Sequence, residues 1–272
     1  MTLVVSWLNL EEPRVPSIWT MADSMISDGA GKIYTLSGAK LLELPVVCKS
    51  LASPDQPVYF RSSIGFSFAG SSLIALNTYA TLSTVLSNLG SSSGALPDFG
   101  SILEKAKRIL MIYASSVRRA AELCLYGICP KSKQPFIGKI IPVISEDGII
   151  DYRIEVHSGL VKKLKVISIG TEDGKVKLDE IIDGMVHEFG EAKTFGYWRI
   201  PAYAMEQILK DRSLKTIGGT AQLTILNYSR FDQYWLPNKI GGYSHKFRTL
   251  DLDEDIGRTL GGCYVAINGM EF

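Results

Sequence analysis

Thr2 is the residue with the clearest capacity for chemistry, because it directly follows the initiator methionine. Methionine removal tolerates a small second residue, and it would leave a threonine that carries both a hydroxyl and a free α-amine. A terminal α-amine titrates at about 7.7 to 8.0, so near neutral pH it can accept the hydroxyl proton. Thr2 is therefore predicted to be a nucleophile with its own base, although a small second residue is also common in proteins without this chemistry.

Other chemical motifs are weaker. The segment Gly29-Ala30-Gly31-Lys32 has part of a phosphate-binding loop, but Ile33 stands where that loop needs a hydroxyl for magnesium. The four cysteines show no Cys-X-X-Cys spacing, and the three histidines are too scattered to suggest a histidine-centred triad. We therefore expect no metal and no cofactor.

Composition indicates a globular protein without a nucleic-acid or membrane partner. The chain has 272 residues, 46% of them hydrophobic, which suffices for one domain with an appendage. Its 29 basic and 28 acidic residues give a net charge of +1, too little for a nucleic-acid binder. Charged residues from Glu11 to Arg14 interrupt any signal peptide, and no apolar run approaches the roughly 20 residues of a membrane span. A cytoplasmic location with reduced thiols is expected.

The pattern of apolar residues predicts an α+β fold. Short strands dominate the first third of the chain, and two amphipathic helices follow, one from Ser71 to Leu89 and one from Asp98 towards Cys124. This order is not a βαβ alternation, so we expect helices on two stacked, mainly antiparallel sheets. The expected strands are 3–8, 18–22, 32–35, 40–44, 58–68, 137–145, 152–156, 164–169 and 221–226, and the later helices are 178–189 and 202–209.

Five segments occur in an order that resembles a known family. They are Thr2-Leu3-Val4-Val5, Met21-Ala22-Asp23-Ser24, Ala39-Lys40-Leu41-Leu42, Gly65-Phe66-Ser67-Phe68-Ala69-Gly70-Ser71 and Gly218-Gly219-Thr220. Together they resemble the proteasome β-subunits and the bacterial HslV-type peptidases, which are N-terminal-nucleophile (Ntn) hydrolases. The resemblance implies a four-layer αββα sandwich over residues 2–228. Residues 229–272 would form an extension packed on this domain or on a neighbouring subunit.

The resemblance also implies a catalytic group. Thr2 matches the nucleophile, with its α-amine as the proton acceptor. Lys40 matches the lysine whose charge holds down the pKa of that amine by like-charge repulsion. Asp23 matches the acidic partner that keeps the lysine charged and oriented. Lys32 is an alternative match for the lysine.

Three further positions have implied roles. Gly70 matches the glycine whose backbone N–H binds the oxyanion. Ser27 falls where a residue that pairs with the substrate is expected, and Thr171 matches the first of the residues that support the terminal amine. The other two supporting positions fall near Leu214 and Ile217, which are apolar, with Asp211 and Thr216 as displaced substitutes. The absence of the family's polar side chains at these two positions favours a protein whose peptidase activity is reduced or absent.

The leading hypothesis is a threonine peptidase that assembles with copies of itself into a ring or an open array. Its implied partners are a peptide or unfolded protein as substrate and an AAA+ unfoldase. Two alternatives stay open: a non-catalytic scaffold or assembly subunit, and an amide hydrolase that acts on a small molecule with the same terminal chemistry.

Overall fold

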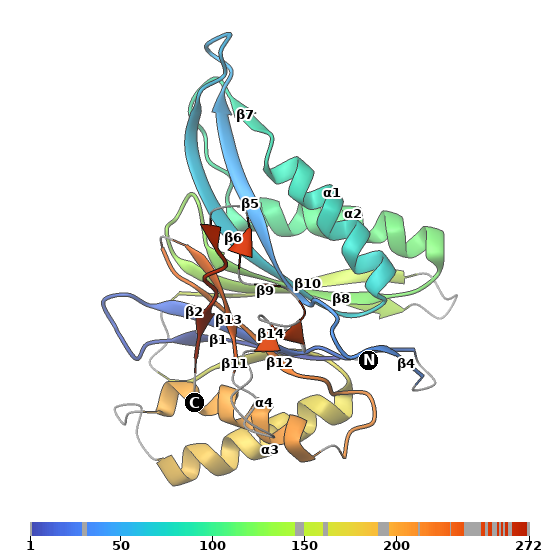
Figure 1. Ribbon diagram of the computed structural model, residues 1–272. Coiled ribbons are helices and arrows are strands. Elements are labelled where there is room, and N and C mark those ends of the chain that lie inside the picture. The colour runs from blue at the N-terminus through green and yellow to red at the C-terminus, as the bar shows by residue number, and fades with distance from the viewer. Residues whose placement is uncertain are drawn as a thin grey trace. The chain divides into compact units, whose positions relative to one another are not determined.

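The computed structural model contains two compact units (Figure 1). The first, here called the N-terminal unit, comprises Met1–Leu41, Lys162–Ile225 and Asp232–Phe272, and the second, the central unit, comprises Leu42–Val161 and Leu226–Phe231. The residues that the structure describes are 2–28, 32–144, 150–159, 163–189, 196–211, 213–228, 230–236, 246–247, 250–251, 255, 257, 259–260 and 263–270.

The N-terminal unit is built on a six-stranded sheet. Its strands, in order across the sheet, are β11 (Val166–Gly170), β1 (Leu3–Asn9), β2 (Ser17–Asp23), β12 (Ala221–Leu226), β13 (Phe231–Trp235) and β18 (Asn268–Gly269). β1 pairs antiparallel with both of its neighbours, so that Leu3 lies opposite Gly170 and Val4 opposite Ala22. The first strand of the chain is thus held on both edges.

Helices cover one face of this sheet. They are α3 (Glu172–Phe189), the short 3-10 helix η1 (Tyr197–Arg199) and α4 (Ile200–Asp211), and Figure 1 shows α3 and α4 side by side. Leu3, Val5 and Trp7 pack into the apolar cluster on this face, as the alternation of side chains along a strand requires. The indole of Trp7 also donates a hydrogen bond of 2.7 Å to the carbonyl of Trp198. β1 is therefore fixed to the helical layer by both apolar and polar contacts.

The central unit also joins a six-stranded sheet to a pair of helices. Across the sheet the strands are β10 (Ile150–Ser158), β9 (Pro135–Ile144), β8 (Ala121–Ile128), β6 (Val58–Gly70), β5 (Leu41–Ser50) and β7 (Leu89–Ser91), and the helices are α1 (Ser72–Leu86) and α2 (Phe99–Val117). Phe66, Leu103 and Leu125 belong to the buried cluster of this unit. β5 and β6 form a long hairpin that extends beyond the other strands (Figure 1).

Three small hairpins complete the described elements. They pair β3 (Ile26–Ser27) with β4 (Ile33–Thr35), β14 (Lys246–Phe247) with β15 (Leu250–Asp251), and β16 (Thr259–Leu260) with β17 (Cys263–Tyr264). No helix in the described part of the chain is long and apolar enough to cross a membrane.

The predicted strands and helices are confirmed in type, but two helices end earlier than expected. The helix from Ser71 ends at Leu86, and Leu89 opens the strand β7, which pairs with β5. The helix that begins after Asp98, whose carboxylate accepts a hydrogen bond from the N–H of Ser101, ends at Val117 and does not reach Cys124. Arg118 takes a left-handed conformation with φ 54°, and the apolar run from Ala121 forms β8, a strand paired on both sides. Beyond β12 the sheet is continued by β13 and β18, which are not among the expected strands. The domain boundary after residue 228 stays a prediction.

Gly65 and Gly184 provide a matched test of this packing. A methyl group at Gly65 would overlap the buried ring of Tyr126, which lies opposite on β8, whereas a methyl group at Gly184 in α3 meets nothing within 4 Å. We expect Gly65→Ala to lower the free energy of unfolding by about 1–3 kcal/mol through overpacking. Gly184→Ala should raise it by about 0.5–1 kcal/mol through helix propensity. Urea denaturation of both variants measures these changes, and equal stability of Gly65→Ala and the unsubstituted chain would contradict the packing of β6 against β8.

Candidate active site

The main chain holds Thr2 in place from two sides. The N–H of Thr171 donates a hydrogen bond of 3.1 Å to the Thr2 carbonyl, and the N–H of Leu3 donates one of 3.0 Å to the carboxylate of Asp23. Gly170 approaches the Thr2 carbonyl so closely, with φ +123°, that a Cβ at this position would overlap the carbonyl oxygen. Thr2 itself is buried. Its place at the start of β1 is therefore set by its own main chain and by Asp23.

The side chain of Asp23 joins three segments of the site. It is the last residue of β2 and is fully buried. Its Oδ1 accepts hydrogen bonds from the Leu3 N–H at 3.0 Å and from the ammonium of Lys40 at 2.8 Å, and its Oδ2 accepts one from the Gly218 N–H at 3.2 Å. One carboxylate thus joins the start of β1, the lysine segment and the loop before β12.

Lys40 completes a buried ion pair. Its side chain is 1% exposed, and its Nζ donates to Asp23 at 2.8 Å and to the carbonyl of Met25 at 2.6 Å. Burial raises the pKa of Asp23 and lowers the pKa of Lys40, because removal from water disfavours each charged form, and the attraction between the two charges opposes both shifts. The charge on Lys40 therefore depends on its contact with Asp23.

The loop that precedes β12 closes over the end of β2. The Gly218 carbonyl accepts hydrogen bonds from the N–H groups of Ser24 and Met25, at 3.2 and 3.0 Å. The N–H of Thr220 donates to the Ser24 hydroxyl at 2.8 Å, and the hydroxyl donates to the carbonyl of Leu36. Gly219, with φ +79°, has no room for a side chain against that hydroxyl. The glycine pair singled out in the sequence thus shapes the wall of the site.

The structure brings Thr2, Asp23, Lys40 and Thr171 together within the N-terminal unit. The Thr171 hydroxyl accepts a hydrogen bond of 3.3 Å from the Gly174 N–H, so it caps the start of α3 while its own N–H holds Thr2. Lys32 is exposed beside β4, with its ammonium 5.7 Å from the ring centre of Tyr34. Lys40 is therefore the lysine that pairs with Asp23.

Other predicted positions have different surroundings. Ser27 lies in β3, opposite Ile33 of β4. Gly70 ends β6 in the central unit, with φ +90° and the carbonyl of Ala120 only 2.9 Å from where a Cβ would stand, so its role as an oxyanion donor stays a prediction. Asp211 forms an ion pair with Lys177 on the surface of the N-terminal unit.

Leu214 and Ile217, which fall near positions that support the terminal amine in the resembled family, pack with the helices. Ile217 is buried in the cluster on the helical face of the sheet, and Leu214 packs against it from a partly buried position. Neither side chain has a polar group to offer to a terminal amine. Thr216, the other displaced substitute, lies between them in the same loop.

The sequence reasoning missed Gln222. This buried side chain of β12 accepts a hydrogen bond from the Lys40 N–H at 3.2 Å through Oε1, and its Nε2 donates to the carbonyls of Asp23 and Gly38, at 3.2 and 2.8 Å. The available signal was an amide within the apolar strand Ala221–Leu226, since buried polar side chains need partners.

Among the described residues, no group of three or more His, Cys, Asp or Glu side chains is placed to hold a metal ion.

Solved structures with the same fold include Anbu from Hyphomicrobium sp. strain MC1. A Gly-1 mutant of Anbu matches with a TM-score of 0.53 and 14% identity, over 86% of this chain and 87% of that chain. Another Anbu structure from this strain has a TM-score of 0.49 and 11% identity, over 85% and 86% of the two chains. Anbu is a bacterial proteasome-like protein related to the Ntn hydrolases.

The chain has a proteasome-like fold. This likeness confirms the predicted α+β fold class and gives no support to the narrower HslV-type assignment. No family model and no curated protein matches the sequence.

The buried ion pair is testable through stability. Lys40→Met would leave the Asp23 carboxylate charged and unpaired in the interior, so we expect a loss of about 3–5 kcal/mol in the free energy of unfolding. Adding Asp23→Asn removes that charge and should restore part of the loss. Lys32→Met, on the surface, should change stability by less than about 0.5 kcal/mol. Urea denaturation compares the three variants, and a Lys40→Met variant as stable as Lys32→Met would contradict the burial of the pair.

Proposed function

We propose that this chain is a proteasome-like threonine peptidase in which Thr2, after removal of Met1, is the nucleophile. The observation that carries the proposal is the buried pair of Lys40 and Asp23, which is joined through the Leu3 N–H to the residue directly after Thr2. An ion pair taken out of water is costly unless it is fully hydrogen-bonded, so its place beside the chain start argues for a role beyond stability. The proteasome-like fold agrees with this reading.

The anchoring of Thr2 supports the role of a positioned nucleophile. Hydrogen bonds to its carbonyl and from the following N–H fix the main chain on both sides of the residue. A nucleophile held in this way avoids part of the entropy cost of reaching an attacking geometry. A fixed ammonium, such as that of Lys40, favours the neutral form of a nearby amine, which is the form that can accept a proton.

The proposed reaction has two stages. The Thr2 hydroxyl attacks the peptide carbonyl and gives its proton to the α-amine, and the resulting ammonium returns the proton to the departing amine of the substrate, which leaves an ester on Thr2. Water, deprotonated by the same α-amine, then attacks the ester and releases the acid product with the threonine restored. Gly70 is the proposed N–H donor to the oxyanion in both stages.

The proposed substrates and partners follow from the same reading. Substrates are peptides or unfolded protein chains, and copies of this chain form a ring or an open array around them. An AAA+ unfoldase is the proposed supplier of unfolded substrate. No cofactor, nucleic acid or membrane has a part in the reaction, and the proposed site of action is the cytoplasm.

A non-catalytic scaffold is the second candidate, and a specific observation favours it. Asp211 is engaged in a surface ion pair, and Leu214 and Ile217 pack with apolar neighbours. The positions that support the terminal amine in the resembled family are thus occupied here by groups with other contacts.

Covalent labelling of Thr2 separates the two candidates. An epoxyketone peptide reacts with a hydroxyl and a free amine on one residue, so we expect one adduct on the peptide that begins at Thr2. Thr2→Ala should abolish the adduct and lower peptide hydrolysis by about 10³-fold or more, whereas Thr2→Ser should retain both. Intact mass first establishes that Met1 is absent. A chain that begins at Thr2 and forms no adduct would refute the peptidase proposal and favour the scaffold.

Self-association is a separate prediction. Apolar side chains are exposed on the two helices of the central unit, with Leu73 of α1 at 61% and Ile112 of α2 at 63% exposure. Repeated heterologous contacts through such surfaces close into a ring or continue as an open helix. Light scattering should therefore give a mass several times that of one 272-residue chain. A monomer at all concentrations would contradict the assembly and leave a peptidase without confinement.

A further inference from the structure

Two glutamine side chains hold the main chain of the lysine segment. Gln222 of β12 accepts a hydrogen bond from the Lys40 N–H at 3.2 Å, and Gln233 of β13 donates one of 3.2 Å to the carbonyl of the next residue, Leu41. Lys40 and Leu41 are consecutive, so the two amides grip the main chain directly at and after the buried lysine. We call Gln222 and Gln233 the glutamine brace.

Gln222 links both members of the ion pair through their main chains. Its Nε2 donates to the Asp23 carbonyl at 3.2 Å and to the Gly38 carbonyl at 2.8 Å, while its Oε1 accepts from Lys40. The side chain is 5% exposed, so bulk solvent does not compete for these bonds. One amide therefore sets the separation between the end of β2, which carries Asp23, and the segment that carries Lys40.

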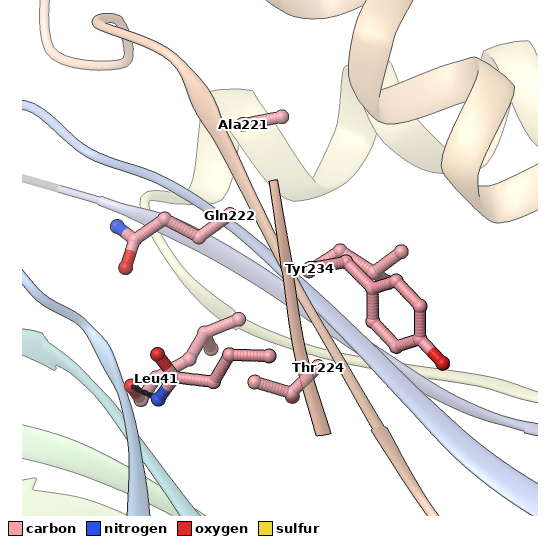
Figure 2. Close-up of a pocket in the computed structure, with 7 residues that line it drawn as sticks. Leu41, Ala221, Gln222, Thr224 and Tyr234 are labelled. Atoms are coloured by element: carbon pink, nitrogen blue, oxygen red, sulfur yellow. Dashed lines mark hydrogen bonds between the residues drawn. The ribbon is translucent and has the colours of Figure 1, made fainter. Parts of the chain in front are cut away.

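Gln233 brings the chain beyond residue 228 into this arrangement. The neighbouring Tyr234 packs against the apolar cluster on the helical face, so the alternation along β13 directs Gln233 to the opposite face. Figure 2 shows Gln222 and Tyr234 on opposite sides of their strands and the hydrogen bond at Leu41 as a dashed line. The cavity beside these residues has a volume of about 10 Å³, which is room for about one water molecule.

We propose that Gln222 and Gln233 are positioning residues that set the place of Lys40 against Asp23, so that β13 completes the active site. The role of Lys40 towards Thr2 rests on the proposed function, but its placement by the brace does not. Without either amide the ion pair keeps its charges and its direct hydrogen bonds, while the segment that carries Lys40 loses one of the two side chains that hold its main chain. Loss of one amide should therefore loosen Lys40 without removing it.

Labelling of Lys40 tests the placement directly. The variants are Gln222→Met and Gln233→Met, which keep side-chain length and remove the amide, and the control is Gln207→Met, at an exposed position of α4. Each is treated with an amine-reactive reagent well below its unfolding midpoint, and modification of Lys40 is followed by mass spectrometry. We expect the rate to rise severalfold in both brace variants and to stay unchanged in the control. Unchanged labelling in both brace variants would overturn the proposal.

The rate of adduct formation at Thr2 distinguishes a positioning role from a purely structural one, because a purely structural role would leave this rate unchanged. The brace variants should bind the epoxyketone with an unchanged inhibition constant and react with it several times more slowly, because binding does not involve Lys40 and the chemical step does. If Lys40 is labelled faster in the brace variants while the unsubstituted protein forms no adduct, the placement of Lys40 by the glutamine brace is supported and the peptidase proposal fails. Faster labelling with an unchanged rate of adduct formation in the brace variants would overturn their part in positioning for the reaction.

Gln222→Glu keeps the test valid if Gln222→Met does not fold. The introduced carboxyl would face two carbonyl oxygens, with Asp23 and Lys40 as the charged groups beside it. When protonated it can donate to one of the two carbonyls that the amide binds, and when ionised it repels both, so its pKa should lie above the usual value of about 4.3. The ratio of Lys40 labelling in this variant to that in the unsubstituted protein should be lowest at low pH and rise with pH. A ratio that stays near one throughout would overturn the proposal.

Discussion

The cost of burying a charged carboxylate is the constraint on which the candidate site depends. An ionised group that leaves water must regain its hydrogen bonds from the protein, and each missing donor costs as much as several well-made contacts provide elsewhere. Asp23 meets this requirement with Lys40 and with the N–H groups of Leu3 and Gly218. Those donors are up to 195 positions away from it in sequence. Satisfying one side chain thus fixes where three distant segments of the chain meet.

This requirement explains why the site is made largely of main chain. Strands β1 and β2 are neighbours in the sheet, so the register that places Val4 opposite Ala22 also brings the Leu3 N–H to Asp23. The loop before β12 passes within hydrogen-bonding distance of the end of β2, and a Cβ at Gly219, with φ +79°, would overlap the Ser24 hydroxyl. A side chain at Gly219 would therefore separate the two segments. The polar network and the close main-chain approach therefore depend on each other.

Sequence reasoning found the charged members of the site but not their supports. Asp23 and Lys40 are predicted through the resemblance of their segments to the Ntn hydrolases and Thr2 through its position after Met1, and periodicity locates most of the strands and helices around them. Gln222 and Gln233 were missed because a side chain that binds the main chain of a distant segment leaves no periodic pattern. The helix after Asp98 was extended too far because an apolar run such as Leu123-Cys124-Leu125 suits a helix and a buried strand equally well. Its end is set at Arg118 by strand pairing that only the folded chain contains.

Thr171 connects the first turn of α3 to the main chain of Thr2. Its hydroxyl caps the first turn of the helix, and its N–H holds the carbonyl of Thr2. A displacement of α3 along its axis would therefore move Thr2, the residue directly before β1. The helix and the main chain of Thr2 are thus coupled through a single residue, so a force along the axis of α3 would be transmitted to the end of the sheet at Thr2.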